Sequence, residues 1–391
     1  MFSLNTVKKY CSEFKMKLFD NSFDSLLWIV SFLPNVMGFA IYYEKVRISF
    51  WIIHFSLLIY VYGLGCSTYI INNVQGIDDY IKNIVNLGLL AIIINSGYWY
   101  LMQRDLLRSF IAETKISIEL LGKSPEIQKE YYKMLSLVRK MLFVFMGTNT
   151  TNFLTSYLPN RINLNNKFSM NPCVGMEPLT SSPNKEICRC VLIVQEITIH
   201  STAVYFQGLL IFLIAHTAVI FHMLSIEIMT LNHIDEQLDL GERDKFIKKK
   251  LISMIRRHVL ILSIVDKLKS LFSIPIGINF GTNFLCISLF FFISLADWVR
   301  YVPILIYCFL VFFLYCFLCQ AVILGAEKFE VAIYSCGWEN FNLEGKKIIF
   351  AMLVQSQKTV EILAADIVPV NISTFATTCQ AIYKFVTIIK F

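Results

Sequence analysis

Long apolar runs recur along the chain, and they constrain its fold more than any other feature. A helix needs about 20 apolar residues to cross the ~30 Å hydrocarbon core of a bilayer. Because unpaired backbone polar groups are costly in lipid, such runs are expected to cross as helices. Seven runs are long enough: Ile48 to Ile71, Tyr80 to Met102, Met134 to Leu158, Val191 to Ile226, Leu268 to Ala296, Tyr301 to Gly325 and Ile367 to Ile389. The sequence therefore predicts an all-α membrane protein with seven transmembrane helices.

Composition agrees with a membrane protein of several spans. Hydrophobic residues make up 56% of the chain and charged residues only 16%, whereas soluble domains contain about 25% charged residues. The net charge of +7 does not indicate a nucleic-acid partner, because in a membrane protein the position of Lys and Arg reports the cytoplasmic side. The expected surroundings are membrane lipids.

An eighth apolar run, Trp28 to Tyr43, is shorter and contains Pro34. Only the charged patch Glu44 to Arg47 separates it from the next run. We interpret it as a re-entrant or interfacial helix that leads into the first true span.

The connections between spans differ strongly in positive charge. Arg104 to Lys140 contains eight Lys and Arg residues and Glu227 to Lys269 contains nine, whereas Asn72 to Asp79 contains none. The positive-inside rule places the two charged connections in the cytoplasm. With seven crossings, the N-terminus is then cytoplasmic and the C-terminus extracellular. This orientation is the reverse of that in a G-protein-coupled receptor.

The connection Arg161 to Arg189 is long, rich in Asn, Pro and Ser, and predicted to be extracellular. It would cover the outer mouth of the bundle as a lid (residues 159–190). Cys173 lies within it, and Cys188 and Cys190 lie near its end. In an oxidising compartment Cys173 could pair with either of these cysteines; free thiols are the alternative.

The cytoplasmic connections have helical apolar spacing and few Gly or Pro breaks. We expect them to extend the spans into a helical cytoplasmic anchor that packs subunits together, the alternative being packing within one subunit. The predicted organisation is an N-terminal part with the re-entrant helix (1–47), six spans (48–326), an anchor helix (327–366) and a last helix (367–391).

Signatures of enzymes are absent from the sequence. It contains no phosphate-binding glycine loop, nucleophile elbow or HExxH pair, and its histidines and cysteines lack metal-site spacing. The sequence therefore predicts no enzyme, no cofactor and no metal. The spans hold few ionisable residues, which disfavours a coupled transporter. A membrane transporter or lipid-modifying enzyme with an unfamiliar site stays open as an alternative class.

The outer halves of several spans contain aromatic, sulfur and small polar side chains. Met146, Thr150 and Phe153 are spaced by four and three residues and so share one helix face. An apolar pocket with one or two hydrogen-bonding groups would suit a small volatile or lipid-like ligand; ordinary helix packing is the alternative. The candidate ligand-binding residues are Leu87, Ala91, Met146, Thr150, Phe153, Ile197, His200, Val204 and Tyr307.

An ordered series of residues near the C-terminus resembles the C-terminal signature of the insect odorant receptors. The series consists of Ala332-Ile333-Tyr334, Trp338, Lys346-Lys347, Met352, Gln355-Ser356-Gln357-Lys358, Ala364, Phe375 and Tyr383-Lys384-Phe385. The phrase Phe221-His222-Met223-Leu224-Ser225 and the long outer loop are similar as well.

This resemblance implies an odorant-gated, non-selective cation channel in the plasma membrane of olfactory sensory neurons, at the dendrite. A tuning subunit would bind a small volatile odorant and form a heterotetramer with the odorant receptor co-receptor. The connection Glu227 to Lys269 has no room for the long insertion of the co-receptor, so the chain resembles a tuning subunit. The sequence does not identify the odorant, because a pocket of Phe, Tyr, Met and Thr suits esters, terpenoids, aromatics and alcohols equally.

The resemblance also assigns roles at the C-terminal end. The last helix would line the pore, with Val386 as the apolar constriction and Ile389 and Lys390 near the outer mouth. Lys390 departs from the family pattern, since a cation near a cation-conducting exit is unfavourable. The subunit anchor would include Tyr334, Trp338, Gln355 and Lys358.

A channel subunit of the gustatory receptor type is the alternative within this superfamily. Those receptors end in Thr-Tyr, five apolar residues and Gln-Phe. Here Ile382 precedes Tyr383, and Ile389-Lys390 stand in place of Gln-Phe, which disfavours that reading.

Overall fold

The computed structural model describes residues 4–37, 39, 48–74, 76–164, 170–233, 240–293 and 295–390, and these residues are almost entirely helical. Its elements are α1 (Leu4–Phe19), α2 (Phe23–Val30), α3 (Phe32–Met37), α4 (Ile48–Leu58), η1 (Ile59–Leu64), α5 (Gly65–Asn72), α6 (Ile77–Met102), α7 (Arg104–Glu119), α8 (Pro125–Asn152), η2 (Phe153–Tyr157), α9 (Leu158–Ile162), α10 (Asn184–Met229), η3 (Thr230–His233), α11 (Leu240–Phe290), α12 (Leu295–Tyr334), η4 (Trp338–Asn340), α13 (Leu343–Ser356), β1 (Leu363–Ala364), β2 (Val368–Pro369) and α14 (Ile372–Lys390).

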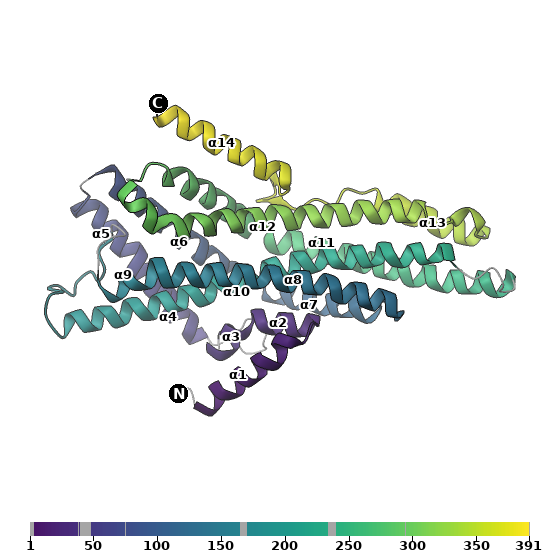
Figure 1. The fold of residues 1–391 in the computed structure, drawn as a ribbon, viewed down its shortest axis with the longest axis horizontal. Helices are drawn as coiled ribbons and strands as arrows, with labels where there is room; N and C mark the ends of the chain where they lie inside the picture. The colour runs from purple at the N-terminus through teal and green to yellow at the C-terminus, as the bar shows by residue number, and fades with distance from the viewer. Residues whose placement is uncertain are drawn as a thin grey trace.

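Helix α10 forms the centre of the bundle. Its apolar stretch is 83% buried, and every side chain from Val204 to Ala215 is buried. A helix that is apolar on all sides belongs in the interior. The long helices α8, α11 and α12 lie around it along the long axis of the molecule (Figure 1).

Helices occupy most of all seven predicted spans in the part of the chain that the structure describes. The exceptions are residues 291–293, which follow the end of α11, and residues 367–371, where a turn, β2 and the N-cap precede α14. Five helical stretches are long and apolar enough by themselves to cross a membrane: Ile48–Asn72, Ile77–Met102, Asn184–Asn232, Tyr301–Asn340 and Ile372–Ile389. The other two predicted spans lie in α8 with η2 and in α11, which both pack against α10. The prediction of an all-α bundle is therefore confirmed.

The N-terminal apolar run does not form one long helix. Ser22 caps α2 by accepting a hydrogen bond from the Ser25 backbone N–H, and α2 and α3 are separated at Ser31. Both short helices pack against α10. Residues 38 and 40–47 of the predicted re-entrant segment lie outside the described residues, and its place relative to a membrane stays a prediction.

The segment 327–366 differs from the predicted single anchor helix. Helix α12 ends at Tyr334, and Gly337 adopts a left-handed conformation (φ 72°) that suits glycine. Asn342 then caps α13 by accepting a hydrogen bond from the backbone N–H of Gly345. After α13 the chain forms the short antiparallel hairpin of β1 and β2, so the helix is interrupted twice.

This hairpin docks on α11 and fixes the position from which α14 starts. The backbone N–H of Ala365 donates to the Ser273 carbonyl oxygen (2.8 Å). The backbone N–H of Asp366 donates to Ser273 Oγ (2.8 Å), whose hydroxyl donates to Asp366 Oδ1 (2.7 Å). Asn371 then caps α14 through the backbone N–H of Thr374 (2.8 Å). Helix α14 leaves the bundle at an angle and points toward the end that carries α5 and α9 (Figure 1).

Gly277→Ala is expected to loosen this docking. A Cβ at Gly277 would lie 2.7 Å from Ala365 Cβ and 2.9 Å from Ala365 N, and the hairpin backbone cannot rotate away. We expect a loss of about 1–3 kcal/mol of unfolding free energy, typical of overpacking, with faster hydrogen exchange in residues 363–370. Thermal unfolding of the purified protein and exchange mass spectrometry measure both effects. Gly281→Ala is the matched control, since nothing lies within 4 Å of that position; equal behaviour of the two variants would contradict the prediction.

At the end of the bundle opposite α5 and α9, long helices continue beyond the predicted spans. Arg257 on α11 is almost fully buried and forms an ion pair with Glu227 of α10. Lys267 forms a second ion pair with Glu113 of α7. Burial lowers the pKa of His258 to about 4 because desolvation disfavours the charged imidazole, so this ring is neutral where it contacts Phe329. These contacts join the helices into one packed unit.

Candidate ligand-binding site

An internal cavity lies between α6, α8 with η2, α10, α11 and α12. The space open to the centre of a water molecule is about 80 Å³, several times the ~10–15 Å³ that one water needs. Its walls are mainly apolar, with several amide, hydroxyl and carboxylate groups. The lining residues are Val85, Leu89, Ile92, Ile93, Asn149, Asn152, Phe153, Tyr157, Glu196, Ile199, His200, Ala203, Gln207, Thr282, Asn283, Cys286, Ile304, Tyr307, Cys308 and Val311.

One face of α10 runs along the cavity. Glu196, His200, Ala203 and Gln207 all line it, and their spacing of four, three and four residues places them on one helix face. At 1.5 Å per residue the stripe from Glu196 to Gln207 is about 16 Å long. It therefore has a charged group at one end, an amide at the other and small or ring side chains between them.

At the Gln207 end of the cavity, two hydrogen bonds link three side chains in a row. Asn149 Nδ2 donates to the Tyr307 hydroxyl (3.1 Å), and this hydroxyl donates to Gln207 Oε1. The Tyr307 proton is thus already used within the protein. This network joins α8, α10 and α12 at the floor of the cavity.

Two of the lining side chains are stacked rings. Phe153 of η2 lies on His200 of α10 with ring centroids 4.5 Å apart and an interplanar angle of 20°. Together with Ala203 they present flat and small surfaces, which suit the apolar body of a ligand.

A buried ion pair closes the Glu196 end. Arg161 Nε donates to Glu196 Oε1 (2.7 Å), and both side chains are at most 5% exposed. Arg161 Nη2 donates to the Tyr62 hydroxyl (3.0 Å), which in turn donates to Glu196 Oε1 (2.9 Å). Three elements, η1, α9 and α10, therefore meet at one carboxylate oxygen.

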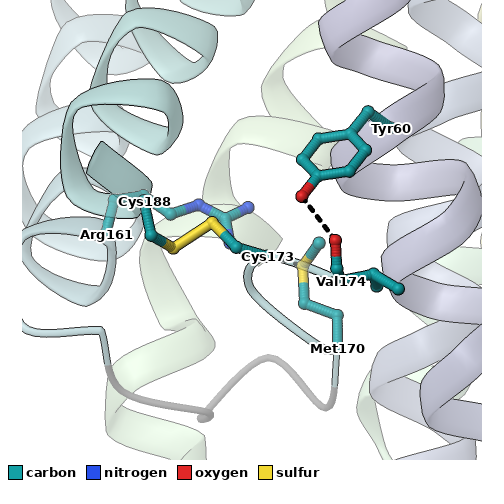
Figure 2. The surroundings of a disulfide bond; sticks show 6 residues. All are labelled: Tyr60, Arg161, Met170, Cys173, Val174 and Cys188. Carbon is teal, nitrogen blue, oxygen red and sulfur yellow. Dashed lines mark hydrogen bonds between the residues drawn. A yellow bond between two sulfur atoms is a disulfide. The ribbon is translucent and has the colours of Figure 1, made fainter. Parts of the chain in front are cut away.

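The lid covers this ion pair. Cys173 and Cys188 form a disulfide that joins the lid to the start of α10, and Figure 2 shows it beside Arg161. Arg161 Nη1 lies 3.4 Å from Met170 Sδ, and the Tyr60 hydroxyl donates to the Val174 carbonyl oxygen (2.8 Å). Of the two pairings that the sequence left open, the structure has Cys173 with Cys188, and Cys190 is an exposed free thiol.

The structure brings three of the nine candidate ligand-binding residues to the cavity wall, namely Phe153, His200 and Tyr307. The other six lie elsewhere: Leu87 and Met146 pack into the core clusters, Val204 is buried, and Ala91, Thr150 and Ile197 are exposed. On α6, α8 and α10 the lining face is turned by one or two residues from the predicted one, whereas on α12 the predicted residue Tyr307 lines the cavity. Neighbouring helices decide this rotation, and the sequence spacing alone does not show it.

Sequence reasoning missed most of the polar wall. Asn149, Asn152 and Gln207 are polar residues inside predicted spans and are not among the candidates. The candidates also include no residue of α11, although Thr282 and Asn283 line the cavity. The one signal in the sequence is the carboxylate of Glu196 near the end of a predicted span. Its partner Arg161 belongs to the outer connection, so the sequence does not show that the two form an ion pair.

The candidate residues of the last helix and the anchor occupy varied positions. Val386 is half-buried and packs against a core cluster, whereas Ile389 is exposed. Lys390 ends α14, and its side chain lies outside the described residues. The anchor candidates comprise exposed Tyr334 and Lys358 and half-buried Trp338 and Gln355.

A seven-helix membrane bundle with a largely apolar cavity between its helices is the architecture of a membrane protein that accommodates a small molecule. A family model described as 7tm odorant receptor matches residues 77–383, which is more than half of the chain. The chain belongs to the odorant receptor family, a family of receptors rather than enzymes.

Individual relatives are distant in sequence and similar in fold. Odorant receptor 22b of Drosophila melanogaster is 25% identical over 157 residues, which cover 38% of this chain and 39% of that receptor. The solved insect olfactory receptor OR5 from Machilis hrabei has a TM-score of 0.76 at 17% identity, covering 92% of this chain and 96% of that one. Its complex with eugenol has a TM-score of 0.74 at 17% identity, covering 97% and 98%. These two structures show the shared seven-helix fold.

Proposed function

We propose that the chain is a tuning subunit of a ligand-gated, non-selective cation channel. It binds a small volatile odorant in the cavity and opens a pore formed with the odorant receptor co-receptor. The largely apolar cavity within an odorant receptor fold carries this proposal. The solved relative bound to eugenol supports a small volatile as the class of ligand.

In this proposal the lid is extracellular, the N-terminus is cytoplasmic and the C-terminus is extracellular, in the plasma membrane of an olfactory neuron dendrite. The charge difference between the connections supports this orientation. The Cys173–Cys188 disulfide supports it independently, because disulfides persist in oxidising compartments.

Gating is proposed to pass from the cavity to α14 through α11. Asn283 lines the cavity, and Ser273 and Gly277 on the same helix hold the hairpin that precedes α14. A ligand that binds more tightly to one arrangement of these helices shifts the population toward it. Val386 then moves away from the pore axis, with Ile389 and Lys390 beyond it. Subunits are held together by an anchor that includes Tyr334, Trp338, Gln355 and Lys358.

Whole-cell recording tests this function. Cells expressing the chain with a co-receptor subunit are expected to give inward cation currents to a blend of volatiles, and cells expressing the chain alone are expected to stay silent. A surface tag on the chain and an activator of the co-receptor serve as controls. Surface-expressed chain that never responds to the blend, although the co-receptor activator gives current, would overturn the proposal.

Phe153→Ala is expected to change the ranking of active volatiles, because it removes the ring that stacks on His200 within the cavity. Each agonist that contacts this ring is expected to lose about tenfold or more in potency, the effect of losing roughly 1.5 kcal/mol of aromatic contact. Thr150→Val, three residues away but exposed and outside the cavity, is the matched control. Concentration–response curves for both variants measure the potency of each volatile. An unchanged ranking in Phe153→Ala would contradict the placement of Phe153 in the binding cavity.

A further inference from the structure

The Glu196 carboxylate has one oxygen in use and one that is not. Within the described part of the chain, the hydrogen bonds from Arg161 and Tyr62 both reach Oε1, and none reaches Oε2. The side chain is 2% exposed and lines the cavity. The protein therefore leaves the acceptor capacity of Oε2 unused, and a ligand in the cavity can donate a hydrogen bond to it.

The ion pair restricts what this oxygen accepts. Glu196 is paired with Arg161, and the carboxylate of such an ion pair accepts hydrogen bonds but donates none. Esters, ketones and ethers also only accept, so their oxygen atoms would face Oε2 without a proton between them. A ligand oxygen at this end must carry a hydrogen.

The same pair argues against a cationic ligand. Arg161 already balances the charge of Glu196 inside the protein. A protonated amine would leave an excess positive charge in a buried site, which is costly. An uncharged hydroxyl donates to Oε2 without changing the net charge of the site.

The opposite end of the cavity offers less discrimination. The Tyr307 hydroxyl donates to Gln207 and accepts from Asn149, so its proton is not available to a ligand. The stripe of His200 and Ala203 between the ends suits an apolar skeleton. A ligand whose polar group lies at Glu196 can place its carbon skeleton along this stripe toward Tyr307.

We propose that Glu196 selects volatile ligands that carry a hydroxyl group, alcohols or phenols, by accepting their hydrogen bond on Oε2. The proposal rests on the proposed function, because it assigns the ligand class of the same cavity. Glu196 is thereby a specificity-determining residue as well as the acceptor of the Arg161 contact beneath the lid.

Matched pairs of volatiles test it. Cells expressing the chain with a co-receptor subunit are exposed to octanol and octyl methyl ether, cresol and methylanisole, and geraniol and its methyl ether. In each pair that gives current, the alcohol or phenol is expected to be at least about tenfold more potent, the preference that one hydrogen bond to a charged group confers. Glu196→Gln adds an N–H that can donate to an ether, and the potency ratio is expected to fall to near one. Thr150→Val is expected to keep the ratio.

Glu196→Asp is the second variant and serves as the test if Glu196→Gln does not reach the cell surface. It keeps the charge and shortens the side chain by one methylene, and it is expected to lower the potency ratio of alcohol to ether. Ethers as potent as their alcohols in the wild-type chain would overturn the inference and leave the channel function intact. A ratio that survives in both Glu196 variants would also overturn it. Silence toward all three pairs overturns the inference, whereas silence toward the broad blend overturns the proposed function.

Discussion

Arg161→Met is expected to destabilise the protein by about 3–5 kcal/mol, the cost of leaving one partner of a buried ion pair uncompensated. Glu196 would keep a buried carboxylate whose remaining contact is the Tyr62 hydroxyl. The lid would also lose the contact between Arg161 and Met170. Thermal unfolding of the purified protein in nanodiscs and the fraction at the cell surface measure this loss.

The double variant Arg161→Met with Glu196→Leu is the control for this prediction. Replacing both members of a buried ion pair with apolar side chains is often neutral or stabilising. We therefore expect the double variant to recover most of the stability that the single variant loses. If the double variant is as unstable as Arg161→Met, the loss comes from packing of the Arg161 side chain and not from its charge.

Cys173→Ser is expected to cost about 3 kcal/mol of unfolding free energy, the chain-entropy value for a loop of 15 residues. The lid would then be held mainly by noncovalent contacts, such as the bond from Tyr60 to the Val174 carbonyl. The transition temperature of the purified protein, measured without reductant, reports the loss.

Cys190→Ser is the matched control for the disulfide, because Cys190 lies two residues from Cys188 and is exposed and free. It is expected to melt like the wild type. Reductant should lower the transition temperature of the wild type and of Cys190→Ser but not that of Cys173→Ser. A reductant effect of equal size in all three proteins would refute the assignment.

The positions of the spans followed from local physics. Each run from Ile48 to Ile389 is apolar over the length that a bilayer requires, and backbone hydrogen bonding in lipid leaves the helix as the available conformation. These properties belong to the segment itself, so no knowledge of neighbouring segments was needed. The interruption of the anchor at Gly337 was less evident, because a single glycine in a helical pattern does not by itself require a break.

The residues that line the cavity could not be predicted from any single segment of the sequence. Phe153 and Thr150 are neighbours on the chain, yet one lines the cavity and the other is exposed. Asn149, Asn152 and Phe153 line the cavity, so the lining face of α8 differs from the face that Met146, Thr150 and Phe153 share. Packing of α8 against its neighbours decides which face is inward, and residue spacing along the chain does not contain that information.

By itself, the sequence determined the all-helical membrane class, the seven spans and, through its C-terminal residues, the family. Only the tertiary structure decided which face of each helix meets the cavity, which cysteine pairs with Cys173, and that Arg161 reaches Glu196. Hydropathy acts on each segment separately, so it can be read in order along the chain. The buried carboxylate and its partner are 35 residues apart, and folding alone brings them together.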